Sequence, residues 1–184
     1  MVNKLSHITT YSKIHFNPID PKAEDIKIED IAHALSLLCR ANGHFERFFS
    51  VAQHSINCAK EAAARRYTKR VQLACLLHDA SEAYISDITR PVKPYLPKYL
   101  EFEKRLQNMI WEKFLGGPLN ADEQKLVFEI DDAEFFHEFL HFMGEKAYET
   151  PPVLMGKPDY ETRDFKSVEN RFLSVFRSLT ENRD

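Results

Sequence analysis

The sequence predicts a single all-α domain with a short β-hairpin at its N-terminus. Apolar residues recur mainly at the three- and four-residue spacing of helices rather than in strict alternation. The chain of 184 residues contains only five glycines, and no Ser/Gly-rich linker divides it. Its 43% of apolar and 29% of charged residues are typical of a globular protein with one ordinary core. We therefore expect one domain over residues 1–184, with its core over about 28–143.

The first 20 residues carry a β-like pattern. In ITTYSKIHF (8–16), β-branched and aromatic residues roughly alternate with others, which predicts a short hairpin or edge strand. The turn-rich segment NPIDPKAED (17–25) connects it to the first helix. In that helix Ile31, Leu35 and Leu38 form an apolar stripe, and Asn42-Gly43 is a candidate end.

Further helices follow, separated by turn and breaker residues. The expected ranges are about 50–66, 69–82, 98–114, 121–143 and 160–180. TRPVKPYLP (89–97) interrupts the pattern with three prolines, and Gly116-Gly117-Pro118 ends the helix that follows it. Asn120 is a candidate N-cap for the long helix over 121–143.

Charge and cysteine content exclude several classes of protein. The net charge of −3 and the pI of about 6.2 disfavour a general nucleic-acid binder, so no stable nucleic-acid partner is expected. Cys39, Cys58 and Cys75 stand in apolar helical contexts without a CxxC pair, which indicates reduced core residues of a cytoplasmic protein. No apolar run reaches membrane length and no export signal is recognised, so no membrane partner is expected.

His78 and Asp79 follow the apolar run Leu73–Leu77 at the end of a predicted helix. Adjacent helical side chains differ by about 100°, so this pair can converge on one ion from a helix end. Imidazole and carboxylate together suit a divalent transition metal, whereas a plain C-terminal histidine would interact with the helix dipole. Glu82 lies four residues beyond His78 and shares its face. It could orient or deprotonate a metal-bound water, or be a solvated helix end.

His54 recurs at helical spacing with Val51, Cys58 and Ala62, so it is expected to face the core. A core histidine of this kind is either a metal ligand or an ordinary hydrogen-bonded residue.

Asp132 lies on the apparent apolar stripe of the helix over 121–143, which is formed by Phe128, Phe135, Phe139 and Phe142. A carboxylate on a core-facing stripe needs a metal or a buried salt bridge, because burying an unpaired charge is costly. Asp131, about 100° away, is expected to be the solvated neighbour.

HEFLH (137–141) matches the HExxH pattern of zinc proteases. His137 and His141 lie about 140° and 180° around the helix from Asp132, so they face away from that stripe. No histidine follows His141 to act as a third ligand, although a Glu or Asp could serve. We therefore interpret HEFLH as a surface helix face.

Arg40 and Asp87 are candidate substrate-binding residues. A guanidinium offers bidentate donors matched to phosphate oxygens, although Arg40 could also interact with a helix dipole. Asp87 precedes a proline by a few residues and could accept hydrogen bonds from a sugar hydroxyl or cap a turn.

The ordered set His54, His78-Asp79 and Asp132 resembles the H…HD…D pattern of the HD-domain metal-dependent phosphohydrolases. The segments SVAQHS, LLHDASEAYISDITRPVK and IDDAE are most similar to the branch of the bacterial 5′-deoxynucleotidases and the phage dATP triphosphohydrolases. The resemblance covers about residues 30–141. It implies a mostly helical fold that is often a homodimer.

The resemblance also implies roles for individual residues. His54, His78, Asp79 and Asp132 would bind one divalent ion, which could be Mn, Co, Ni, Zn, Fe or Mg. Glu82 would act in catalysis with Asp79, Arg40 would orient the phosphate and Asp87 would lie in the substrate-binding turn. Ala41 departs from the deoxynucleotidases, in which a bulky aromatic residue follows the arginine and shapes the sugar pocket.

The expected function is a metal-dependent hydrolysis of (deoxy)nucleoside 5′-monophosphates to nucleoside and phosphate, with a nucleotide as the small-molecule partner. A dNTP triphosphohydrolase of the same fold is the first alternative. A zinc protease using His137 and His141 and a non-catalytic nucleotide-binding module are the others.

Overall fold

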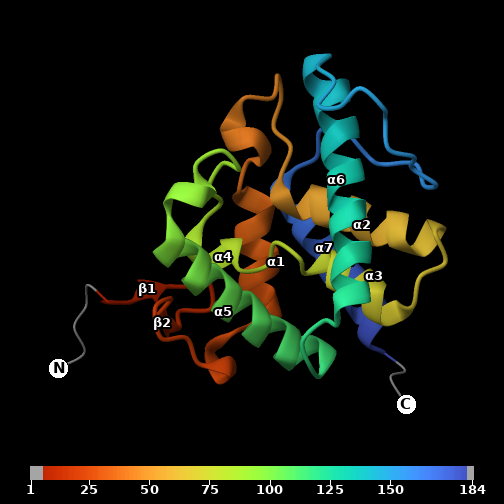
Figure 1. Cartoon of the computed structure of the whole chain (residues 1–184). Coiled ribbons are helices and arrows are strands. Elements are labelled where there is room, and N and C mark those ends of the chain that lie inside the picture. Colours follow the sequence, from red (N-terminus) through yellow and green to blue (C-terminus); the bar gives the residue numbers. More distant parts are fainter. Residues whose placement is uncertain (1–5, 182–184) are drawn as a thin grey trace.

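The computed structural model describes residues 6–181, and this part of the chain is mostly helical (Figure 1). Its α-helices are α1 (Ile28–Leu37), α2 (Val51–Ala64), α3 (Lys69–Leu76), α4 (Glu82–Ile85), α5 (Pro97–Leu115), α6 (Ala121–Met143) and α7 (Phe165–Thr180). Short 3₁₀ turns occur at η2 (Ala23–Asp25), η3 (Arg40–Gly43) and η4 (Lys93–Tyr95). The predicted all-α class is confirmed.

The N-terminal hairpin is also confirmed from residue 8 onward. Strands β1 (Ile8–Thr9) and β2 (His15–Phe16) pair antiparallel, with Ile8 opposite Phe16. Phe16 is fully buried and stacks on Tyr84 of α4 with ring centroids 4.2 Å apart. This aromatic contact attaches the hairpin to the helical core.

Helix α2 lies at the centre of the helical core. It packs against α1, α3, α6 and α7, and α6 crosses in front of α2 and α3 (Figure 1). Ser50 begins α2 with a capping box, since its hydroxyl accepts from the Gln53 N–H and the Gln53 side chain accepts from the Ser50 N–H. Most of α2 is buried, including His54 at 0% exposure. The prediction that His54 faces the core is therefore confirmed.

Several helix ends differ from the sequence prediction. The helix predicted over 69–82 ends at Leu76, and a turn separates it from α4. The first helix ends at Leu37, before the left-handed residues Ala41 and Asn42, whose φ angles are 51° and 50°. The last helix begins at Phe165, because Asp164 caps it by accepting from the Ser167 N–H.

Two smaller predictions have opposite outcomes. Asn120 caps α6 as predicted, in a capping box with Glu123. Cys39, predicted to be a core residue, is exposed because it lies in the extended stretch after α1, whereas Cys58 and Cys75 are buried free thiols.

No helix in residues 6–181 combines the length and the apolar character that a membrane span requires.

Candidate metal centre

His78 and Asp79 lie in the turn between α3 and α4, which α5 holds in place. Gln107 of α5 accepts from the Ser81 N–H at 3.1 Å and donates to the Leu77 carbonyl at 2.7 Å. Nδ1 of His78 lies 2.7 Å from the carbonyl oxygen of Cys75. Because a carbonyl only accepts, Nδ1 carries the proton in this contact and Nε2 is left free to bind a cation.

Four side-chain atoms from three parts of the chain converge beside this turn. Nε2 of His54 lies 3.1 Å from Nε2 of His78 and 3.1 Å from Oδ1 of Asp131. Nε2 of His78 lies 3.2 Å from Oδ2 of Asp79 and 3.5 Å from Oδ1 of Asp131. Oδ2 of Asp79 is 3.9 Å from Nε2 of His54. The sequence thus brings two imidazoles and two carboxylates to one point.

These separations fit one divalent cation. Nitrogen and oxygen ligands bind such ions at about 2.0–2.2 Å, which places neighbouring ligand atoms about 3.0–3.5 Å apart. Neutral imidazole with carboxylate suits transition metals in general and Mg less well.

Cys58 offers a thiol to the same region. His54, Cys58 and His78 have ligand atoms within 4.8 Å of one another, and within residues 6–181 this triplet is a candidate metal group. However, burial raises the pKa of the Cys58 thiol well above its usual range, and the nearby Glu134 and Asp131 raise it further. The set of His54, His78, Asp79 and Asp131 offers four converging ligand atoms rather than three, so it is the stronger candidate.

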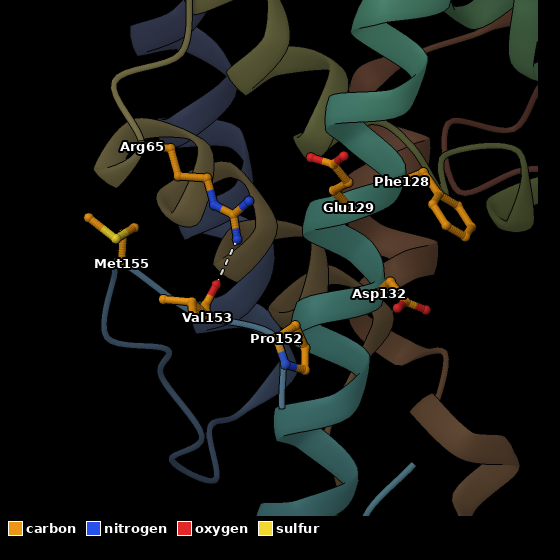
Figure 2. A pocket seen from close by; sticks show the side chains of 7 residues that line it. All are labelled: Arg65, Phe128, Glu129, Asp132, Pro152, Val153 and Met155. Atoms are coloured by element: carbon orange, nitrogen blue, oxygen red, sulfur yellow. Dashed lines mark hydrogen bonds between the residues drawn. The ribbon is translucent and has the colours of Figure 1, made fainter. Parts of the chain in front are cut away.

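The assignment of Asp132 is wrong, because the structure places Asp131 at the histidines instead. Asp132 contacts the Tyr148 hydroxyl and, at 3.3 Å, Nη1 of Arg90. Phe128, which was expected to mark the core-facing stripe, is 62% exposed. Figure 2 shows Phe128 and Asp132 projecting from the same side of α6, beside a surface cavity of about 460 Å³ that Val153 also lines.

Glu138 is a candidate functional residue that the sequence interpretation missed. Its Oε1 lies 2.6 Å from Nδ1 of His54, and its Oε2 accepts from Nε and Nη2 of Arg40 at 3.2 and 3.1 Å. The side chain is fully buried. The interpretation of the whole HEFLH segment as a surface face is therefore wrong at Glu138. Glu138 lies seven residues, or about two turns, beyond Asp131, and that spacing could have revealed it.

The two histidines of HEFLH do not form a joint site. Nε2 of His137 lies 2.8 Å from the Pro152 carbonyl. His141 is exposed and stacks on Tyr160 with ring centroids 4.5 Å apart. Among the residues that the structure describes, neither histidine belongs to a candidate metal group.

A cleft of about 640 Å³ opens beside the four converging atoms. Its polar lining includes the predicted site residues Arg40, Asp79, Glu82 and Asp87 together with Asp131. Its apolar lining includes Ile88, Pro91, Phe135, Phe139 and Met143. This substrate-sized cleft combines an apolar surface with a few polar groups next to the candidate cation site, as small-molecule sites commonly do.

Arg40 enters the cleft from η3. Its Nη1 lies 3.7 Å from Oδ2 of Asp79, while Glu138 holds the other edge of the guanidinium. The following Ala41 also lines the cleft, and its backbone is left-handed with a φ of 51°. Arg90 packs over the ring of Phe135 at 4.8 Å and forms a flat part of the wall.

Burial and neighbouring charges set the ionisation of the site. Burial alone would raise the pKa of Asp79, but the adjacent His78 outweighs it and holds that pKa at about 2. For Glu82, burial and the nearby Asp79 and Asp87 all act in one direction and raise its pKa well above the usual value. Glu82 is 5% exposed, and its Oε2 has no hydrogen-bond partner among the described residues. It can therefore keep a proton where Asp79 cannot.

Comparison with known proteins places the chain in a family. It is 35% identical over 148 residues to the uncharacterized protein RCAP_rcc00048 of Rhodobacter capsulatus, a match that covers 77% of this chain and 74% of the relative. The chain therefore belongs to the same family as that protein. It is also 39% identical over 121 residues to the uncharacterized protein YfdR of Escherichia coli, covering 66% of this chain and 65% of YfdR. No protein-family model matches the chain.

Proposed function

We propose that the protein is a metal-dependent phosphohydrolase of the HD-domain type that acts on nucleotides. The reaction supported best is hydrolysis of (deoxy)nucleoside 5′-monophosphates to nucleoside and phosphate. The proposal depends on one observation, the convergence of His54, His78, Asp79 and Asp131 beside a cleft that Arg40 and Glu82 also line. The order of these residues along the chain supports it through the resemblance described above, with Asp131 in place of Asp132.

The four converging side chains would hold one divalent cation, with Mn, Co, Ni, Zn, Fe and Mg as candidates. When bound, such an ion supplies charge neutralisation for a phosphoryl group and lowers the pKa of water. His78 is oriented for this role by the Cys75 carbonyl, and His54 by Glu138. Both contacts fix the imidazole so that Nε2 faces the site.

Arg40 would bind the phosphate of the substrate. A guanidinium gives two parallel donors to phosphate oxygens, and Glu138 holds the Arg40 side chain at the edge of the cleft. Phosphoryl transfer needs mainly positioning and charge stabilisation, so a fixed Arg40 supplies much of what the reaction requires.

Glu82 would hold or transfer the proton in the reaction. Its buried carboxyl lines the cleft beside Asp79, and its raised pKa lets it hold a proton at a higher pH than an ordinary glutamate. The free Oε2 atom is available to a water or to a substrate oxygen.

The nucleoside part would lie along the apolar wall. Phe135, Phe139 and Met143 offer the flat, apolar contact that a base requires, and Asp87 offers a hydrogen-bond acceptor for a sugar hydroxyl. Ala41 leaves the sugar region wider than a bulky aromatic residue would. A dNTP substrate is the alternative that this extra space admits.

A nucleotide screen tests the proposal. The purified protein is loaded in turn with Mn²⁺, Co²⁺, Ni²⁺, Zn²⁺, Fe²⁺ and Mg²⁺, and the release of phosphate and of triphosphate is measured for each nucleotide. We expect metal-dependent phosphate release that Asp79→Ala abolishes without unfolding the chain. Retained activity in Asp79→Ala at full metal loading would contradict the assignment. Tight nucleotide binding without turnover under every metal would indicate a non-catalytic module instead.

A further inference from the structure

Arg90 belongs to the wall of the substrate cleft and reaches it from the segment between α4 and α5. Its guanidinium carbon lies 4.8 Å from the centroid of the Phe135 ring, and both residues line the cleft. The backbone of Arg90 is held in a turn, because the Val92 N–H donates to the Thr89 carbonyl at 2.8 Å. Arg90 therefore presents a planar cation to the cleft from a defined position.

The edge of the Arg90 guanidinium is engaged by α6. Its Nη1 donates to Oδ1 of Asp132 at 3.3 Å, and its Nη2 lies 3.8 Å from Oδ2 of Asp131. The Tyr148 hydroxyl donates to the same oxygen of Asp132. Asp132 is not one of the four converging residues, and in this structure it anchors Arg90 instead. Because two carboxylates already compensate the charge of Arg90, its flat face is what it offers to a ligand.

Aromatic rings support this flat surface. The ring centroids of Phe135 and Phe139 are 4.4 Å apart, and Phe139 packs edge-on against Phe45 at 5.3 Å. Phe45 is buried, so the row of rings is anchored in the interior, whereas the Arg90 side chain at the other end of the row is 56% exposed. A planar group that is held in place before binding loses little conformational entropy when a ligand stacks on it.

We propose that the nucleobase of the substrate stacks on Arg90, which makes Arg90 a specificity-determining residue that selects nucleotides over sugar phosphates without a base. The inference rests on the proposed function, in which Arg40 binds the phosphate. Guanidinium planes and aromatic rings both stack on bases, and every base has a face for such a contact. Arg40 lies 3.7 Å from Asp79, whereas Arg90 lies 3.8 Å from Asp131. The two arginines thus stand at different ligands of the candidate cation site and can contact different parts of one nucleotide.

Binding of nucleosides tests the stacking without any turnover. The 2′-deoxynucleosides of adenine, guanine, cytosine and thymine are each titrated into the Mn²⁺-loaded protein by isothermal calorimetry. We expect at least one of them to bind. Its affinity should fall at least about five-fold in Arg90→Lys, because lysine keeps the positive charge but lacks the flat face.

Arg105→Lys is the matched control for this titration. Arg105 is an exposed residue of α5 that packs over the Phe102 ring at 5.8 Å, and it is not among the described residues that line the cleft. The control therefore makes the same replacement in the same kind of pair outside the cleft, and it should bind the nucleoside like the wild type. Unchanged affinity in Arg90→Lys, or no binding of any of the four nucleosides to the wild type, would overturn the inference.

Ligands with and without a base separate this inference from the proposed function. If the protein hydrolyses nucleotides, Arg90→Lys should raise the KM for the 5′-monophosphate of the bound nucleoside at least about five-fold. It should leave the inhibition constant of 2-deoxyribose 5-phosphate unchanged. An equal loss for both ligands would assign Arg90 to the phosphate or the sugar and overturn the inference while the function stands. Weaker nucleoside binding in Arg90→Lys, in a protein without hydrolysis, would support the stacking site and contradict the function.

Discussion

Nδ1 of His54 and Oε1 of Glu138 lie 2.6 Å apart, and both side chains are excluded from solvent. Burial alone would raise the pKa of Glu138, but His54 and Arg40 outweigh it and lower that pKa. Glu138 therefore stays ionised and directs Nε2 of His54 toward the candidate cation site. Carboxylate–histidine pairs of this kind commonly orient metal ligands. The same carboxylate holds Arg40, so one buried residue positions a metal ligand and the candidate phosphate-binding group.

Glu138→Gln should weaken divalent-metal binding by about 10- to 100-fold, the usual effect of removing a carboxylate that orients a ligand. The amide keeps the size of the side chain but loses its charge, so His54 and Arg40 are held less firmly. Isothermal titration with Mn²⁺ measures the change. Glu129→Gln is the control, since Glu129 is an exposed residue of the same helix. Equal metal affinity in a folded Glu138→Gln protein would show that Glu138 does not orient the site.

Asp131→Asn and Asp132→Asn form a matched pair of neighbours on α6. Asp131 lies 3.1 Å from Nε2 of His54, whereas Asp132 contacts Tyr148 and Arg90 at the surface. Asp131→Asn should therefore lose most of its metal affinity and all metal-dependent activity, because a charged ligand becomes neutral. Asp132→Asn should keep both within about two-fold. Metal content after dialysis, measured by mass spectrometry, tests this, and the reverse order of effects would restore the Asp132 assignment.

The pattern of apolar residues was enough to predict most of the helices, because their ends carry local signals. Helix α5 ends next to Gly116 and helix α6 begins after Asn120, both within one or two residues of the predicted positions. The turn at 77–81 has no Gly or Pro, so nothing local marks the end of α3 at Leu76. That end is fixed by Gln107, which binds the turn from a distant helix, and tertiary hydrogen bonds of this kind leave no periodic trace in the sequence.

The choice between the two aspartates failed for a similar reason. A stripe of phenylalanines resembles a core face, but Phe128 is exposed at the surface of α6. The buried face of α6 instead carries Ile130, Glu134 and Glu138. A pattern of apolar residues cannot predict a buried face that carries acidic residues. Such exceptions to the apolar pattern are expected at functional sites. Glu138 was missed because the whole HEFLH segment was interpreted as a surface face, whereas this residue is fully buried.

Glu134 should make the stability of the protein fall as the pH rises. Burial, reinforced by the nearby Glu138, raises the pKa of Glu134 to about 8, compared with about 4.3 in an unfolded chain. Between these values the folded state holds a proton that the unfolded state has lost, so the free energy of unfolding decreases with pH. Above the folded pKa the loss is complete and no longer grows.

Glu134→Gln removes this titration. From pH 5 to pH 8 the wild type should lose about 1 to 3 kcal/mol of unfolding free energy relative to the variant. Urea denaturation at several pH values measures the difference. If the difference in unfolding free energy between the wild type and Glu134→Gln stayed constant from pH 5 to pH 8, Glu134 would titrate normally in the folded state.

Glu82→Gln should separate metal binding from turnover. The amide preserves the shape of a side chain that is 5% exposed, and it lies three residues from the nearest candidate ligand, Asp79. We therefore expect a folded protein whose metal affinity stays within a few-fold of the wild type. An amide cannot accept or deliver a proton, so kcat should fall by about 10²- to 10⁴-fold. Glu101→Gln, on the exposed face of α5, is the charge-matched control and should keep its kcat. Turnover of metal-loaded Glu82→Gln at the wild-type rate would show that another group handles the proton.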